Sequence, residues 1–314
     1  MKKSLIPKMG VLLLIALLFL TAGCAREEKT AAARAKVTKE QVEKFQKEKK
    51  QKKVDIYVPI KEQFATSKHS KSLQTLLKYK GQIKPACYSC MSGDYFLAPQ
   101  NNKPDPKTVK YSVTCAVCHI LTVNEFKLRL DPLETCTSCH NNGREIVPGE
   151  VVHHPQKEMF LGIGAIGVPK IPDSKYKAGL TCIECHMPNE AHTFVGKTPA
   201  QALKEHTGSI CIMCHADQSE TEFAKEVTSI QNKIESDLKK LAAGLREDGL
   251  KLAEAQRLGQ DVTVARQVYN IVFTNLSFVE NDGSKGVHNF EYAKKIIEIT
   301  TAKKKQLDKL LEGY

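Results

Sequence analysis

Cys182-Ile183-Glu184-Cys185-His186 is one of four runs with the same spacing in this chain of 314 residues. In each run two cysteines stand three positions apart and a histidine follows directly. Two such thiols can add to the vinyl groups at one haem edge, and the histidine can then ligate the iron. A zinc site or redox pair does not require that histidine four times. The haem motifs are Cys115/Cys118/His119, Cys136/Cys139/His140, Cys182/Cys185/His186 and Cys211/Cys214/His215.

A fifth run departs from this pattern at its last position. Cys87-Tyr88-Ser89-Cys90 is followed by Met91, where the other motifs have histidine. Both thioether anchors are present, so the run predicts a further haem with Met91 in place of the usual axial ligand. In chain order this run is the first motif, and the runs that begin at Cys115, Cys136, Cys182 and Cys211 are the second to fifth motifs. The alternative is a disulfide or a dithiol at Cys87 and Cys90. The expected cofactors are therefore five covalently bound c-type haems.

The histidines outside the motifs are candidates for the second axial ligand of each low-spin haem. The chain has ten histidines, and four belong to the motifs, which leaves six for four or five irons. Most of these six are therefore expected to bind iron. They are His69, His153, His154, His192, His206 and His288.

The eleventh cysteine, Cys24, follows a segment with the parts of a bacterial export signal, predicted as residues 1–23. Its apolar run from Val11 to Leu20 is too short to cross a bilayer. Leu20-Thr21-Ala22-Gly23-Cys24 resembles the lipobox of bacterial lipoproteins. This predicts an exported protein that is anchored to the membrane by lipid on Cys24 and faces the periplasm or the cell exterior. The alternative is a secreted protein with an unpaired thiol.

Residues 24–54 are predicted to form the lipidated N-terminus and a charged tether. Residues 26–53 contain eleven Lys or Arg and five Glu, so they contribute +6 of the formal net charge of +12. They have too few large apolar residues to form a core. A solvated spacer is the simpler interpretation, and a patch that contacts anionic lipid is the alternative. Nucleic acid is not expected as a partner, because an exported protein does not meet it.

The rest of the chain divides into a haem-binding region, residues 55–216, and a helical region, residues 217–314. Gly and Pro interrupt the first region often, and it cannot bury enough apolar side chain without its haems. The expected fold class is mainly α. It is a multihaem cytochrome c with little regular structure around a packed haem chain, followed by long C-terminal helices.

The helical region shows a clear apolar periodicity. Apolar residues recur at steps of three and four from Val227 to Leu245, which predicts one stripe of a long helix. Further helices are expected over Val262–Val279 and from Asn289 to Leu311, with Gly283 and Gly286 between them. The stripe indicates core packing, and a homodimer face formed by these helices is the alternative.

The order of these features resembles the ammonia-forming cytochrome c nitrite reductases and the related hydroxylamine oxidoreductase group. In the nitrite reductases the first of five haems is the active site, and a lysine occupies the position of Met91. Besides the altered first motif, the resemblance rests on Ser67-Lys68-His69-Ser70, His154-Pro155-Gln156-Lys157-Glu158, the stretch from Thr181 to Pro188, and Gly286-Val287-His288-Asn289.

The resemblance also implies roles for four histidines. His192, His69 and His288 correspond to the distal ligands of the second, third and fourth haems. His154 corresponds to the pocket histidine that faces the open side of the first haem. The histidine expected shortly before Cys182 is missing, so His206 or His153 is the candidate ligand of the fifth haem.

Other features of the family are missing as well. His140 is followed by Asn141, Asn142 and Gly143, so the family's tyrosine after the third motif is absent, as is the acidic residue of the adjoining calcium site. The arginine before the first motif is also absent, because lysines and His69 are the only basic residues between Asp55 and Cys87.

Two functions from different classes follow. In the first, all irons are six-coordinate and the protein transfers electrons in an anaerobic respiratory chain, with other redox proteins or quinol-oxidising cytochromes as partners. Met91 and an imidazole such as His154 would then ligate the first haem. In the second, the first haem is open and reduces nitrite, hydroxylamine or a similar small nitrogen or sulfur compound. His154 and His153 would then be the catalytic residues, as proton donors or stabilisers of negative charge. The missing tyrosine and arginine favour electron transfer.

Overall fold

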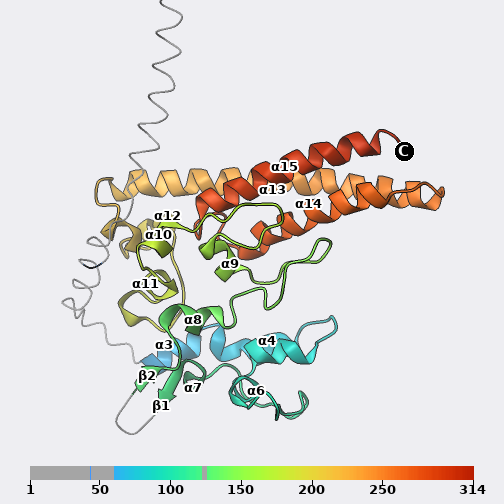
Figure 1. Ribbon diagram of the computed structural model, residues 1–314. Coiled ribbons are helices and arrows are strands. Elements are labelled where there is room, and N and C mark those ends of the chain that lie inside the picture. The colour runs from blue at the N-terminus through green and yellow to red at the C-terminus, as the bar shows by residue number, and fades with distance from the viewer. Residues whose placement is uncertain (1–42, 44–59, 122–125) are drawn as a thin grey trace, which may run out of the picture. The chain divides into compact units, whose positions relative to one another are not determined.

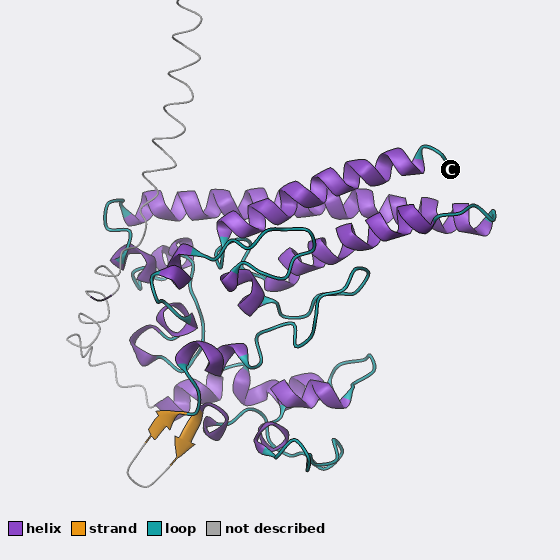
Figure 2. Cartoon of the chain, in the orientation of Figure 1, coloured by secondary structure: helices purple, strands orange, loops and turns teal. Residues whose placement is uncertain are grey.

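The computed structural model describes residues 43, 60–121 and 126–314. Residues 60–314 of this described part belong to one compact unit. Helices dominate it, and its one sheet has two short strands (Figures 1 and 2), which confirms the predicted mainly α fold. The predicted signal peptide, Cys24 and, apart from Glu43, the charged tether lie outside the described residues. Within those residues, no helix is long and apolar enough to cross a membrane.

The haem-binding region consists of short helical turns that are separated by loops (Figure 2). Its α-helices are α3 (Ile60–Thr66), α4 (Ser72–Leu77), α5 (Tyr88–Met91), α6 (Gly93–Leu97), α7 (Cys115–Cys118), α8 (Pro132–Thr137), α9 (Gln156–Leu161), α10 (Ser174–Lys177), α11 (Cys182–His186) and α12 (Pro199–Lys204). Its 3-10 helices are η1 (His69–Lys71), η2 (Pro85–Cys87), η3 (Pro188–Glu190) and η4 (Ile210–Met213). Strands β1 (His119–Leu121) and β2 (Phe126–Leu128) pair in antiparallel orientation.

Three long helices follow, and they lie against one another along their length (Figure 1). They are α13 (Glu220–Arg257), α14 (Thr263–Asp282) and α15 (Phe290–Leu311). The predicted ranges for α14 and α15 are therefore confirmed to within three residues at each end.

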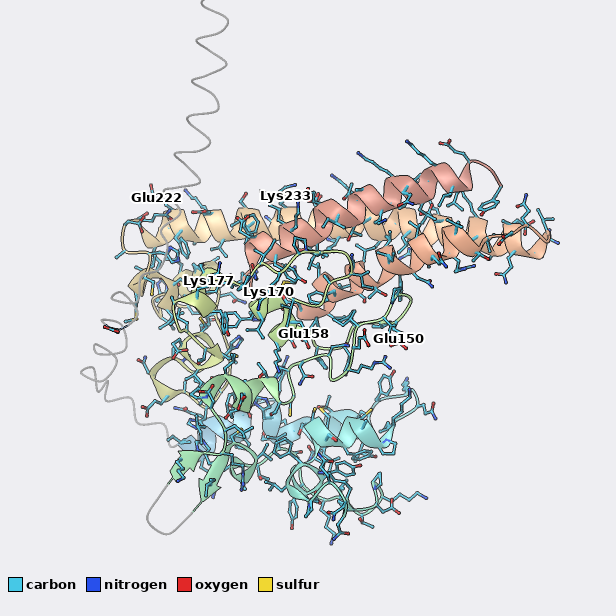
Figure 3. The ribbon with its side chains drawn as sticks, in the orientation of Figure 1. Glu150, Glu158, Lys170, Lys177, Glu222 and Lys233 are labelled. Carbon is cyan, nitrogen blue, oxygen red and sulfur yellow. The ribbon has the colours of Figure 1, made fainter. Side chains whose placement is uncertain are left out.

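The ends of these helices have local causes in the sequence. Ser219 and Glu222 form a capping box at the start of α13, where Figure 3 labels Glu222. Gly283 ends α14 with a left-handed φ of 75°, a conformation that costs glycine little. Asn289 accepts a hydrogen bond from the Tyr292 backbone N–H and so caps α15.

The apolar stripe of α13 packs inside the chain. Ile234, Leu241 and Leu245 are buried in a cluster with residues of α14 and α15. A fully buried side chain of this size contributes about 1.5–3 kcal/mol. The largest fully buried side chains of the cluster are Tyr292, Phe278, Met159, Leu252, Ile296 and Leu307.

Polar side chains of α14 form hydrogen bonds with the loop before α9 and with the loop after it. The Thr274 hydroxyl accepts from the Gly149 backbone N–H at 2.9 Å, and the Asn275 amide exchanges two hydrogen bonds with the Ile166 backbone. The Asn281 amide donates to the Val152 carbonyl at 2.7 Å. Buried backbone groups without such partners would destabilise the loop. The α14 side chains therefore replace regular secondary structure in this loop.

Asn289 joins the C-terminal helices to α9 and to the loop that follows α9. Its side-chain nitrogen donates to the carbonyls of Met159 and Ile171, at 3.1 and 2.8 Å, and its side chain is almost fully buried. At this junction Gly162 has a φ of +63°, and a Cβ there would lie 1.8 Å from the Ile171 carbonyl oxygen. A side chain is thus excluded at Gly162.

We expect Asn289→Ala to destabilise the protein by about 2–4 kcal/mol, because it removes a helix cap and the two side-chain hydrogen bonds to the carbonyls of Met159 and Ile171. Thermal unfolding followed by far-ultraviolet circular dichroism measures the effect. Asn232→Ala, at an exposed position of α13, is the matched control. An equal melting temperature for the two variants would contradict the role assigned to Asn289.

Candidate haem-binding sites

Each cysteine pair lies on or beside a single helical turn. Residues three positions apart face the same side of such a turn, so each pair presents its thiols in one direction. The fourth motif is the most regular, because Thr181 and Glu184 form a capping box directly around Cys182 at the start of α11. In the described part of the chain, none of the ten motif cysteines forms a disulfide.

Three pairs of histidines face each other across short gaps. In each pair one histidine belongs to a motif and the other comes from a distant segment. The ring centroids are 6.2 Å apart for His119 and His192, 6.0 Å for His140 and His69, and 6.1 Å for His186 and His288.

These separations fit axial ligation of a haem iron. A metal bound to a ring nitrogen at about 2 Å lies roughly 3 Å from the ring centroid, so two axial imidazoles have centroids about 6 Å apart. Such an iron needs only two protein ligands, since the porphyrin supplies four. In the described part of the chain, no group of three or more His, Cys, Asp or Glu side chains could hold a metal ion.

The electrostatic environment favours neutral imidazoles at most of these positions. Burial lowers the pKa of His69, His119, His140 and His186, and neighbouring histidines lower it further at the last three. A metal-binding nitrogen must be deprotonated. The lowered pKa values therefore prepare these side chains for ligation.

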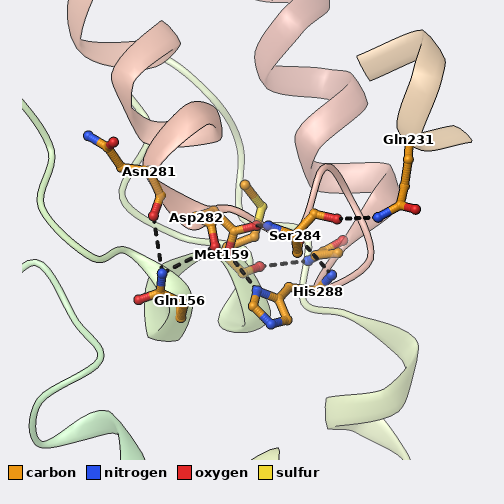
Figure 4. A network of polar contacts seen from close by, with 8 residues as sticks. Gln156, Met159, Gln231, Asn281, Asp282, Ser284 and His288 are labelled. Carbon is orange, nitrogen blue, oxygen red and sulfur yellow. Dashed lines mark hydrogen bonds and ion pairs between the residues drawn. The ribbon is translucent and has the colours of Figure 1, made fainter. Parts of the chain in front are cut away.

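His288 differs from the other histidines in its surroundings. Burial alone would lower its pKa, but the charge and hydrogen bond of Asp282 outweigh burial and raise it. The distance from His288 Nδ1 to Asp282 Oδ1 is 2.7 Å (Figure 4). Sequence reasoning missed Asp282, which has no motif of its own and stands six positions before the histidine.

The cysteines show which motifs are neighbours. The Cys90 thiol approaches the Cys139 carbonyl at 4.0 Å, and a hydrogen bond with the Cys139 side chain raises the pKa of Cys90. A hydrogen bond with Cys182 likewise raises the pKa of Cys136. The third motif therefore lies against both the first and the fourth.

Two further contacts extend this chain of motifs. Burial raises the pKa of Cys118, and the charge of Cys139 adds to the shift. Burial also raises the pKa of Cys185 to about 12, with a further contribution from Cys211. The second motif is thus close to the third, and the fifth is close to the fourth.

The first motif lies on an apolar cluster. Met91 is half-buried against the cluster of Leu73, Leu76, Tyr88 and Tyr95. Its carbonyl accepts a hydrogen bond from the Ser72 hydroxyl at 2.8 Å, which ties the motif to α4.

His154 and His153 lie beside the third motif. The ring centroid of His154 is 6.5 Å from that of His140 and 4.1 Å from that of His153. His154 has a φ of 52°, an uncommon conformation for a residue with a side chain. Within the described residues, its ring contacts are with His140 and His153.

The histidine of the fifth motif contacts a phenylalanine, whereas the histidines of the second, third and fourth motifs each face a distant histidine. The His215 ring stacks on Phe223 with centroids 4.3 Å apart. His206 is exposed just after α12, and among the described residues no ring contact joins it to His215. The distal ligand of the fifth haem therefore stays a prediction, with His206 and His153 as candidates.

The sequence and structure match several known proteins. A family model described as cytochrome c552 matches residues 172–312. The structure of the outer cell wall cytochrome OcwA is similar, with a TM-score of 0.66 and 31% identity. This match covers 77% of the present chain and 49% of OcwA, so the chain spans about half the length of that protein. No curated protein matches the sequence.

Two other structures share the fold at lower identity. The undecahaem cytochrome from the S-layer of Carboxydothermus ferrireducens has a TM-score of 0.55 and 23% identity, and the match covers 76% of this chain and 40% of that one. The catalytic subunit of cytochrome c nitrite reductase from Desulfovibrio desulfuricans ATCC 27774 has a TM-score of 0.54 and 16% identity, and the match covers 77% of this chain and 70% of that one. Together with the haem motifs, the family model and the similarity to OcwA support assignment of this chain to the multihaem c-type cytochromes, a family with covalently bound haems.

We expect His288→Ala to convert one low-spin haem into a high-spin haem, because the iron facing His186 would lose one of its two protein ligands. Electron paramagnetic resonance of the oxidised protein measures the conversion. Val287→Ala, the adjacent exposed position of the same loop, is the control and should keep the low-spin signal. Full low-spin intensity in both variants would show that His288 does not bind iron.

Proposed function

We propose that this protein is a lipid-anchored pentahaem cytochrome that transfers electrons in an anaerobic respiratory chain outside the cytoplasm. The observation that carries the proposal is that each haem motif lies close in space to at least one other motif. Cys139 lies close to Cys90 and Cys118, while Cys136 lies close to Cys182 and Cys185 to Cys211. Haems attached at these cysteines would be close-packed, and close-packed haems exchange electrons readily.

In this function, the protein side chains would hold each iron in place and occupy both of its axial positions. Bound haems supply the one-electron redox centres. The pairs His119/His192, His140/His69 and His186/His288 would hold three irons in a six-coordinate state. Two imidazoles on an iron leave no position for a substrate, so these three sites favour electron transfer over catalysis.

The first motif decides between the two candidate functions. For electron transfer, Met91 and an imidazole would close the first haem, and a methionine ligand raises a haem's potential. For catalysis, the first haem would be open and would reduce nitrite, hydroxylamine or a similar compound, with His154 or His153 nearby. The absence of the family's tyrosine after the third motif and of its arginine before the first motif favours electron transfer.

Export and anchoring rest on the N-terminal sequence. The lipobox-like stretch before Cys24 supports a lipid anchor, and two structurally similar cytochromes belong to the outer cell wall and to an S-layer. Attachment to an envelope surface would allow the haems to meet redox partners at the periplasm or the cell exterior. A cytochrome held there could accept electrons from a quinol-oxidising cytochrome.

For the first haem, we expect the purified protein to contain five covalent haems and to be entirely low-spin. Added nitrite, hydroxylamine or cyanide should leave its visible spectrum unchanged, because no iron has an open position. Intact mass spectrometry counts the haems, and absorption spectroscopy detects ligand binding.

The double variant Cys87→Ala and Cys90→Ala is the matched control for the haem count, and it should lose the mass of one haem. A wild-type protein with four haems would show that the first motif is not an attachment site. A rapid spectral change with nitrite, followed by sustained turnover to ammonia, would establish the reductase instead.

For the anchor, we expect Cys24→Ser to release the protein from membranes, because the basic tether alone would be held by contacts that salt screens. Immunoblotting of washed membranes measures the release. Wild-type protein should remain bound in high salt. Equal retention of the two proteins after such a wash would rule out a lipid on Cys24.

A further inference from the structure

Asp282 is a buried carboxylate at the end of α14, and it holds a predicted haem ligand. Its side chain is fully buried, and Oδ1 lies 2.7 Å from Nδ1 of His288. The other oxygen, Oδ2, accepts from the Ser284 backbone N–H at 3.2 Å and from the Ser284 hydroxyl. Figure 4 shows these contacts in the loop between α14 and α15.

The hydrogen bonds account for a carboxylate in this position. A buried charge without partners would be strongly destabilising. Asp282 has three donors instead, namely Nδ1 of His288 and the two groups of Ser284. Hydrogen bonds of this kind offset the cost of burying a carboxylate.

The surrounding loop is itself fixed in place. The Gln156 side-chain nitrogen donates to the carbonyls of Asn281 and Asp282, both at 3.1 Å (Figure 4). The Ser284 hydroxyl accepts from the His288 backbone N–H at 3.0 Å. The His288 ring is thus oriented through both its backbone and its side chain.

Other candidate ligands have weaker partners at the same ring position. Nδ1 of His186 faces the Phe194 carbonyl at 3.4 Å, and Nδ1 of His192 faces the Glu190 carbonyl at 2.7 Å. Both acceptors are neutral backbone groups. Asp282 instead offers a negative charge to His288, and a charge-assisted hydrogen bond is roughly twice as strong as a neutral one.

A carboxylate at Nδ1 changes the ligand as well as its orientation. It fixes the tautomer with hydrogen on Nδ1, leaves Nε2 free for the metal, and raises the basicity of Nε2. A more basic axial ligand stabilises the ferric state more than the ferrous state. The reduction potential of the haem is lowered as a result.

We propose that Asp282 is a positioning residue that orients His288 and lowers the reduction potential of the haem attached at Cys182 and Cys185. This inference rests on the ligation of that haem by His186 and His288, which belongs to the proposed function. It adds a residue outside every haem motif that sets the potential of one site in the chain.

The first test is Asp282→Asn in the full-length protein with its haems attached. Asparagine keeps the size and one acceptor oxygen, but it removes the charge. We expect all haems to stay low-spin, while one midpoint potential shifts in the positive direction. Spectroelectrochemical titration, followed by electron paramagnetic resonance, measures both quantities. His288→Ala identifies the affected haem, because the same signal should become high-spin.

A second variant tests whether the midpoint potential can also be shifted in the opposite direction. Ser284→Ala keeps the carboxylate and removes the hydroxyl that donates to it, so more of the negative charge is available to the hydrogen bond with His288. The variant also removes the acceptor of the His288 backbone N–H, and the spin state of that haem shows whether His288 still binds iron. We expect the same midpoint to shift in the negative direction. This variant retains Asp282 and therefore tests the proposal if Asp282→Asn does not fold.

The matched control is Asp248→Asn, at a buried aspartate of α13 that pairs with Lys304 at 2.9 Å. It should lower the melting temperature without moving any midpoint, because it lies in the helical core. Unchanged midpoints in both the Asp282 and the Ser284 variants, or a shift at a different haem, would overturn the proposal. A low-spin signal that survives in His288→Ala would instead overturn the underlying ligation.

Discussion

The predicted ligation of three haems imposes one geometric requirement, which is that two imidazoles lie about 6 Å apart across each of these three irons. In the three histidine pairs, the partners of the motif histidines come from α3's neighbouring turn η1, from the segment after η3 and from the α14–α15 loop. Such long-range ligation would hold together short turns that have little core of their own. The small cluster around Tyr88 and Tyr95 is the only buried apolar cluster other than the main one in the described residues. Haem attachment and the helical core therefore stabilise different parts of one unit.

The C-terminal helices contribute to the haem sites through their ends. The core fixes α14 against α15, and the loop between them carries Asp282 and His288. Side chains of α14 also hold the loop with His153 and His154. The connection through Asn289 means that a change in the helical core can displace both α9 and the His288 loop. The helices thus act as a rigid support whose position determines ligand geometry.

Much of this arrangement could be predicted from the sequence. The cysteine spacing predicts haem attachment, and the apolar periodicity predicts the long helices, because both are repeated local patterns. The resemblance to the nitrite reductases pairs His69, His192 and His288 with the same motif histidines that the structure brings close.

Other features could not be predicted, because they depend on contacts between distant residues without a periodic signal. Asp282 is an ordinary helix-terminal aspartate in the sequence, and only the fold shows its bond to His288. Thr274 and Asn275 interrupt the apolar face of α14 as polar residues, yet they are fully buried and bind loop backbone. His154 corresponds by family position to the first haem, and only the fold shows that its ring also lies near His140 and His153. The third motif is close to the first, the second and the fourth, so haems bound in this order would form a branched path. The first haem would then lie at one end of a branch. If Met91 completes the coordination of its iron, this haem can pass electrons to a redox partner. If its iron has an open position, this haem can reduce a bound substrate.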